Sequence, residues 1–306
     1  MIKRLILTSL LPVLTVSLWA GDNPLTSVVE SRQFKDYWYH GKAELNRYKL
    51  EQARYGEIHK GDAVLIFVTE NFLTDLQVKH EYGEAKSATT VLKLNFGRYF
   101  VTGIYPYSIL TSVFSPVNLN RWEHSLKLSG STQEWCGQVY SQLNLRGDEY
   151  KGLLHSYFQK EADQQIELPE TWLEDEIWTR IRLAPNSLPT GEFKIIPALY
   201  FMRFKHLDFK IYSAHAAMTT ASDPALSDKE LKIYTLKYGD LDRELKIKFE
   251  NEFPFAIVGW EETFESGWGD KAKHLTTKAV RTHTLFTDYW TKNSVADSTY
   301  RKKLGL

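Results

Sequence analysis

The chain has 306 residues, with 38 basic and 38 acidic side chains, so its formal net charge at pH 7 is zero. Because no excess of positive charge is present to attract a polyanion, no nucleic-acid partner is predicted. The one cysteine, Cys136, excludes an internal disulfide, and a core of this size does not need one.

The first 20 residues have the order of a secretory signal peptide. Lys3 and Arg4 precede an uncharged run from Leu5 to Trp19, and Ala20 and the turn-forming residues after it form the predicted cleavage site. The run is shorter than the roughly 20 residues of a membrane-spanning helix, although an uncleaved anchor is the alternative. No cysteine follows the run, so a lipoprotein is not expected. We predict a periplasmic or secreted protein whose residues 21–306 form one β-rich envelope domain that does not span the membrane.

Alternating apolar and polar residues, many of them aromatic or β-branched, predict strands through most of residues 21–306. In the first half these lie at Lys42 to Tyr55, Ala63 to Thr69 (a central strand), Thr90 to Phe96, Arg98 to Ile104, Ser108 to Phe114, Glu123 to Leu128, Gln133 to Leu145 and Glu149 to Lys160. Glycine-containing turns at Ser129 to Ser131 and Arg146 to Asp148 are expected to join the last three strands.

An amphipathic helix is predicted at about residues 170–183. Thr171 and Glu174 have the spacing of a capping box, Leu173, Ile177 and Ile181 recur every four residues, and Pro185 ends the helix. Later strands are expected at Glu192 to Phe204, Leu207 to Ala216, Glu230 to Tyr238, Glu244 to Glu250, Phe255 to Phe264 and His274 to Phe286, with a long loop at Ala216 to Asp228 and a short C-terminal helix at Ser298 to Leu304.

This series of strands lacks the alternation of strands and helices that a parallel sheet requires. It therefore predicts a mainly β fold, in the form of a large curved antiparallel sheet or a partial barrel with one clear helix.

Several segments resemble an uncharacterised family of exported, β-rich bacterial proteins of about this length. The matching segments are Gly41-Lys42-Ala43-Glu44, Tyr48 to Gly56, Gln133-Glu134-Trp135-Cys136-Gly137, Trp290 to Ser294 and Lys303-Leu304-Gly305-Leu306. Similar proteins often carry the label "septum formation inhibitor Maf". The Maf family itself looks like cytoplasmic nucleotide pyrophosphatases with an N-terminal Ser-x-Ser-Pro-Arg-Arg motif, which does not occur in this chain. The resemblance implies an exported β-rich protein and no known site residues.

Few residues suggest catalysis. Cys136 could serve as a nucleophile if neighbouring strands bring His124 or His155 close to it, although a free cysteine more often packs as a small apolar residue. Glu261 and Glu262, which follow an indole, could act on a glycan. The nine histidines have no metal-ligand spacing, and neither a glycine-rich phosphate loop nor a Gly-x-Ser-x-Gly motif occurs, so no metal or cofactor is predicted.

The aromatic content suggests a binding function. Nine Trp, 17 Tyr and 16 Phe would fill a core, or would line a curved sheet that accepts an apolar ligand. The candidate ligand-binding residues are Tyr105, Tyr107, Trp135, Trp172, Trp178 and Trp260. We favour a non-enzymatic protein that binds a lipid, another amphipathic envelope ligand or a partner protein. The alternatives are an envelope hydrolase acting on glycan or peptidoglycan and a purely structural or interaction protein.

Overall fold

A computed structural model describes residues 29, 31–84 and 86–306. The predicted signal peptide lies outside these residues. Within the described part of the chain, no helix is long and apolar enough to cross a membrane.

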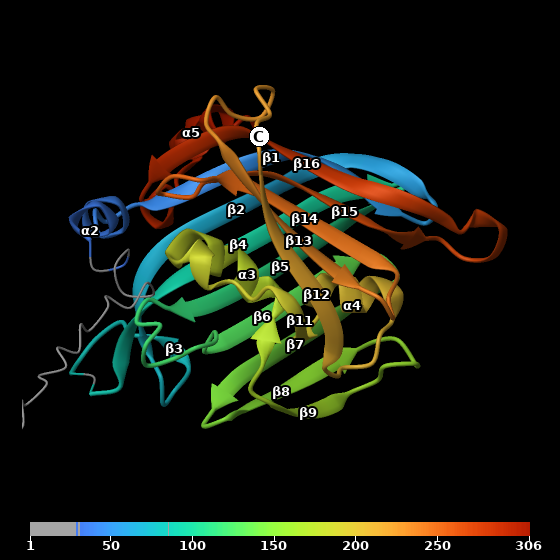
Figure 1. The fold of residues 1–306 in the computed structure, drawn as a ribbon, viewed down its shortest axis with the longest axis horizontal. Helices are drawn as coiled ribbons and strands as arrows, with labels where there is room; N and C mark the ends of the chain where they lie inside the picture. The colour runs from blue at the N-terminus through green and yellow to red at the C-terminus, as the bar shows by residue number, and fades with distance from the viewer. Residues whose placement is uncertain (1–28, 30, 85) are drawn as a thin grey trace, which may run out of the picture.

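One large open sheet contains all 16 strands (Figure 1). Its order is β10-β11-β12-β13-β14-β15-β16-β1-β2-β4-β5-β6-β7-β8-β9, with the short β3 paired to β2. Neighbouring strands are antiparallel except for β10 and β11. The strands are β1 (Ala43–Arg54), β2 (Glu57–Leu73), β3 (Val78–Lys79), β4 (Ala88–Thr102), β5 (Tyr105–Pro116), β6 (Lys127–Glu134), β7 (Gly137–Arg146), β8 (Glu149–Ser156), β9 (Gln164–Pro169), β10 (Trp172–Leu173), β11 (Gly191–Ile196), β12 (Tyr212–Ala221), β13 (Leu231–Tyr238), β14 (Arg243–Glu250), β15 (Ile257–Ser266) and β16 (Lys273–Thr287).

Four α-helices in the described part of the chain accompany the sheet. They are α2 (Arg32–Trp38), α3 (Glu174–Leu183), α4 (Leu199–Lys205) and α5 (Ser298–Lys303), and short 3-10 turns lie at Pro185–Ser187, Gly269–Lys271, Tyr289–Thr291 and Val295–Asp297. The mainly β architecture, the curved antiparallel sheet, the helix near residues 170–183 and the short C-terminal helix are thus confirmed.

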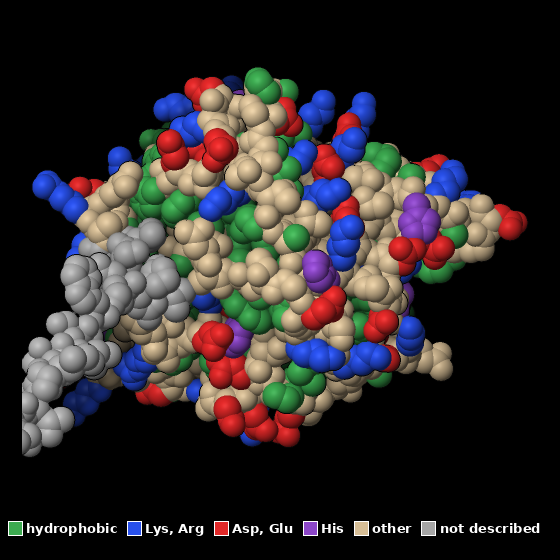
Figure 2. Space-filling view, in the orientation of Figure 1, with side chains coloured by type: hydrophobic (Ala, Val, Ile, Leu, Met, Phe, Trp, Pro, Cys, Tyr) green, Lys and Arg blue, Asp and Glu red, His purple; other side chains and the backbone are tan. Residues whose placement is uncertain are grey.

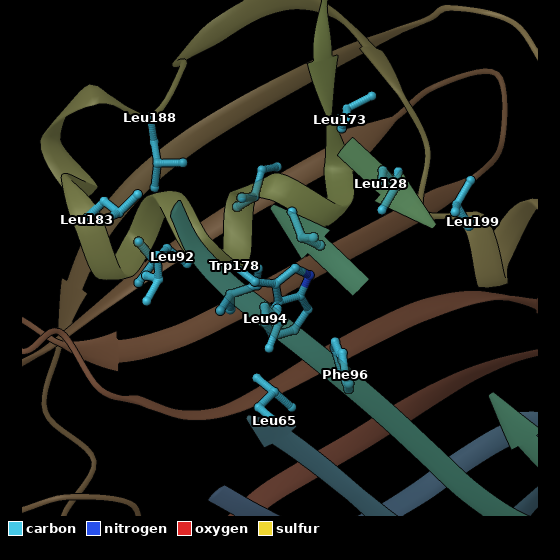
Figure 3. Close-up of a cluster of buried hydrophobic side chains, with 14 of the residues drawn as sticks. Leu65, Leu92, Leu94, Phe96, Leu128, Leu173, Trp178, Leu183, Leu188 and Leu199 are labelled. Carbon is cyan, nitrogen blue, oxygen red and sulfur yellow. The ribbon is translucent and has the colours of Figure 1, made fainter. Parts of the chain in front are cut away.

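The sheet curls around α3, and all ten residues of this helix are buried. The Trp178 ring lies 5.0 Å from Phe96 on β4 and 5.2 Å from Trp260 on β15, so it joins distant parts of the sheet. Figure 3 shows Leu94 of β4 next to this ring, with Leu65 of β2 and Phe96 of β4 nearby. Helix α4 covers the neighbouring part of this inner face, where Phe204 packs against Phe100. The concave side of the sheet is therefore filled by the chain's own helices.

The predicted strand from Gln133 to Leu145 is wrong. The chain turns at Trp135 and Cys136, between β6 and β7, whereas the turn predicted at Ser129–Ser131 lies inside β6. Gly130 instead allows α4 to pack closely on β6, because an added Cβ there would lie 2.9 Å from a methyl group of Leu199 on α4.

Other boundaries also differ from the prediction. The expected strand from Glu192 to Phe204 ends at Ile196, and α4 begins at Leu199, whose backbone N–H donates to Asp175. Thr171 does not cap α3, because its hydroxyl donates to the carbonyl of Lys194, and α3 begins only at Glu174. The local sequence pattern did not predict these element boundaries, because each of them depends on a contact between distant segments.

Candidate functional site

The structure separates the residues proposed for thiol chemistry. Cys136 is exposed in the turn after β6, whereas His124 precedes β6 and is buried near its opposite end. His155 lies on β8 and pairs with Asp163 at 3.3 Å. A hydrogen bond with Glu134 raises the pKa of Cys136, which disfavours the thiolate form that a nucleophile needs.

Glu261 and Glu262 occupy opposite faces of β15. Glu261 pairs with Lys248 at 2.9 Å on the outer face, whereas Glu262 is buried and bonds Arg243 at 2.7 Å. Since adjacent side chains of a strand point to opposite sides of a sheet, these two carboxylates cannot act on one substrate.

The predicted ligand-binding aromatic residues also fall into separate places. Tyr107, Trp178 and Trp260 are buried in the core. Trp172 lies half-buried beside His124, at a centroid distance of 5.0 Å. Tyr105 and Trp135 occupy two hairpin turns and stack at 6.4 Å.

A buried ionic network connects α3 to the sheet. Arg243 on β14 donates to both carboxylate oxygens of Glu174 and also to Glu262, and Tyr238 donates to Glu174 at 2.7 Å. Arg182 makes a second bidentate pair with Glu44 on β1, with both distances 2.7 Å. Because these charges satisfy one another away from solvent, we assign them to the fold and not to chemistry.

An apolar pocket lies on the outer face of the sheet, defined as the face away from α3 and α4. Its volume is about 590 Å³, and its roof is the C-terminal segment, residues 288–306. Residues that pair directly across strands form its floor. One row is Leu285, Leu45 and Ile66, and the next row is Val64, Gly97 and Leu110. Leu304 and Leu306 of the C-terminal segment complete the apolar lining.

Charged groups stand at the C-terminal wall of this pocket. Lys292 pairs with Asp288 at 3.0 Å, and Asp297 accepts a hydrogen bond from the hydroxyl of Ser294 at 2.7 Å. Arg301 also lines the pocket, and among the residues that the structure describes it has no ion-pair partner. The pocket thus combines an apolar floor with a polar wall in which the described residues give Arg301 no ion-pair partner, while Asp62 and Asp297 also line it.

A second, polar hollow of about 750 Å³ lies near the start of α3. Its lining includes Glu123 and Glu170, together with Trp122 and Trp172. Burial, and to a lesser degree the charge of Glu123, raise the pKa of Glu170, although His124 opposes the shift. Arg180 lies over the Trp172 ring, 4.9 Å from its centroid.

Sequence reasoning missed the outer pocket, although one signal was present. The run Ala63-Val64-Leu65-Ile66-Phe67-Val68 is apolar at every position, and both faces of such a strand must be covered. The inner cover is α3 with its neighbours, and the outer cover is the C-terminal segment.

No protein-family model, curated protein or solved structure matches this chain. Within the described residues, no group of three or more His, Cys, Asp or Glu side chains is placed to hold a metal ion.

Proposed function

We propose that the protein is an exported envelope protein that binds an anionic amphipathic ligand, of the fatty-acid or lipid class, in the outer pocket. The observation that carries the proposal is the pairing of an apolar floor with the guanidinium of Arg301. An acyl chain would lie over Leu45, Val64 and Ile66, while its acidic head group would bind Arg301.

The dimensions of the pocket support this assignment. Its volume of about 590 Å³ lies within the range of about 300–1,000 Å³ that is typical of small-molecule sites. On the inner face of the sheet, in contrast, the buried side chains of α3 and α4 fill the space. An apolar pocket under a covering segment also shields an acyl chain from water, which is the main driving force for binding it.

Replacing Arg301 with alanine is expected to weaken oleate binding by about three- to tenfold, since a partly exposed charge pair contributes about 1 kcal/mol. Binding of the uncharged oleyl alcohol should be unchanged. Lys302→Ala is the matched control, because Lys302 lies on the same helix but does not line the pocket. Displacement of a fluorescent acyl probe measures each affinity.

A substitution that fills the pocket tests whether the ligand lies on its apolar floor. Ile66→Trp is expected to abolish binding of both ligands while leaving the circular dichroism spectrum unchanged. If the wild-type protein binds neither ligand, or if Ile66→Trp binds both as tightly as wild type, the proposal is wrong.

The polar hollow favours a second candidate, an envelope hydrolase acting on glycan. Glu170, with its raised pKa, is suited to act as the acid and Glu123 as the base, and the two indoles offer surfaces on which sugar rings stack. Release of soluble fragments from peptidoglycan by wild type, with at least a hundredfold loss in Glu170→Gln, would support it. Equal release by wild type and variant, or none from either, would refute it.

A further inference from the structure

Six hairpin connections meet at one end of the sheet, which is the right-hand end in Figure 1. They are residues 55–56, 103–104, 135–136, 157–163, 239–242 and 267–272, and all but residues 239–242 lie beside exposed or half-buried aromatic side chains. In an antiparallel meander, alternate turns lie at the same edge, so segments far apart in sequence become neighbours there.

Aromatic side chains run continuously through five of these turns and form what we call the aromatic arc: Trp268, Tyr55, Tyr105, Trp135 and Tyr157. The ring centroids of Trp268 and Tyr55 are 5.5 Å apart, and the hydroxyl of Tyr105 donates to that of Tyr55 at 3.2 Å. Tyr105 and Trp135 stack at 6.4 Å, and Tyr157 packs over Gly137, where an added Cβ would lie 2.8 Å from its ring.

Much of this aromatic surface faces solvent. Exposed fractions reach 70% for Trp135, 78% for Tyr157 and 58% for Trp268, and Ile104 in the central turn is 78% exposed. Neither of the central turns, residues 103–104 and 135–136, contains a charged residue, and the side chain of Glu134 beside them is buried against Arg203. Large exposed apolar side chains gathered on one edge indicate an interaction surface.

The arc is held outward by the layer beneath it. The guanidinium of Arg54 lies 4.2 Å from the Tyr55 centroid and 4.4 Å from that of Phe204, and it donates to the carbonyl of Phe204. Tyr55 also shares a 2.6 Å hydrogen bond with the buried Tyr107. Because the guanidinium of Arg54 and the packed rings of Tyr107 and Phe204 fill the space beneath the arc, its exposed rings have no room to move into the core.

We propose that the aromatic arc docks on the interface of a lipid bilayer, with Ile104 and Trp135 inserted among the head groups. Trp and Tyr favour this region because their rings combine an apolar body with a polar tip. The surface consists of protruding turns, which suits a planar bilayer better than a single ligand chain. Lys271 and Lys273 lie beside Trp268 and can reach lipid phosphates, while Glu57 in the same hollow and the neighbouring Asp270 balance their charge.

The outer face of β4 links the arc to the outer pocket. Tyr99 lines the pocket, Val101 follows two residues later on the same face, and Ile104 lies in the turn, all three exposed. The docking proposal goes beyond the proposed ligand and does not depend on it, but docking would bring the pocket close to the membrane.

Sedimentation with vesicles tests the proposal. We expect wild type to bind phosphatidylcholine vesicles, because insertion of apolar and aromatic side chains does not require an anionic lipid. The double variant Ile104→Ser/Trp135→Ser should reduce the partition coefficient at least tenfold, since both side chains lose apolar burial. Trp290→Ser is the matched control: Trp290 is 50% exposed, but it follows the opposite end of β16.

Brominated lipids give a second measurement. Trp fluorescence of wild type should be quenched on binding, and the quenching should fall in Trp135→Phe but not in Trp290→Phe. The proposal is overturned if the double variant binds vesicles as well as wild type, or if wild type binds isolated peptidoglycan or a protein through the arc but no vesicles. Oleate affinity should be unchanged in the double variant, so failure of this proposal is distinguishable from failure of the pocket.

Discussion

Replacing Arg243 with methionine is expected to lower the free energy of unfolding by about 3–5 kcal/mol, the cost of breaking a buried ion pair from one side. Arg243 is completely shielded from solvent, and it alone neutralises both Glu174 and Glu262. In the variant these two carboxylates would remain buried without a cation. Urea denaturation followed by Trp fluorescence measures the change.

Lys246→Met provides the control on the same strand. Its partner is the half-exposed Glu244 at 2.6 Å, so its loss should cost less than about 1 kcal/mol. A variant of Arg243 that is as stable as Lys246→Met would show that the network does not connect α3 to the sheet.

Stability should decrease as the pH rises from about 5 to 8, and Asp175→Asn should remove most of this decrease. Burial raises the pKa of Asp175 to about 7, from 3.8 in the unfolded chain. Between these values the folded state holds a proton that the unfolded state has lost, so each unit of pH costs the fold about 1.4 kcal/mol, or about 3 kcal/mol between pH 5 and 7, above which both states are ionised.

Measuring above pH 5 excludes the contributions of the other buried carboxylates of the ionic network. For Glu44, Glu174 and Glu176, burial opposes ionisation, but their cationic partners outweigh it and lower each pKa, so their contribution is lost only on acidification. His124 is also buried, yet Glu176 raises its pKa, and its contribution falls with rising pH in the same direction as that of Asp175. Asp175→Asn retains His124, so the difference between the two proteins isolates Asp175. If the free energy of unfolding of the two proteins changed with pH in parallel, the prediction would be contradicted.

The asparagine should preserve the local structure, because its side-chain oxygen can still accept the N–H of Leu199 at the start of α4. Unchanged circular dichroism at pH 5 would confirm that the substitution acts through ionisation alone.

Sequence patterns predicted the strands well where one face is apolar. Strands β1, β5 and β16 lie within a few residues of their predicted ranges, and α5 was also predicted. The patterns failed where a residue is required by a contact with a distant segment, as Gly130 is by its contact with Leu199 on α4. They also failed at Glu192 to Phe204, because an apolar run of this length is compatible with a strand or with a buried helix.

The candidate sites were predicted less well than the fold. Tyr105 and Trp135 were named from composition, and the structure places both in the aromatic arc, but the residues of the outer pocket were not named. A pocket between the C-terminal segment and the middle of five other strands has no local signature, because its walls lie far apart along the chain.

The alternation and spacing of neighbouring side chains were enough to predict a mainly β protein with one clear helix. That α3 fills the curve of the sheet, that an apolar pocket lies on the opposite face, and that five turns carry one aromatic arc became visible in the folded chain. Strand order and sheet curvature determine which distant residues meet, and neither is encoded in a local period.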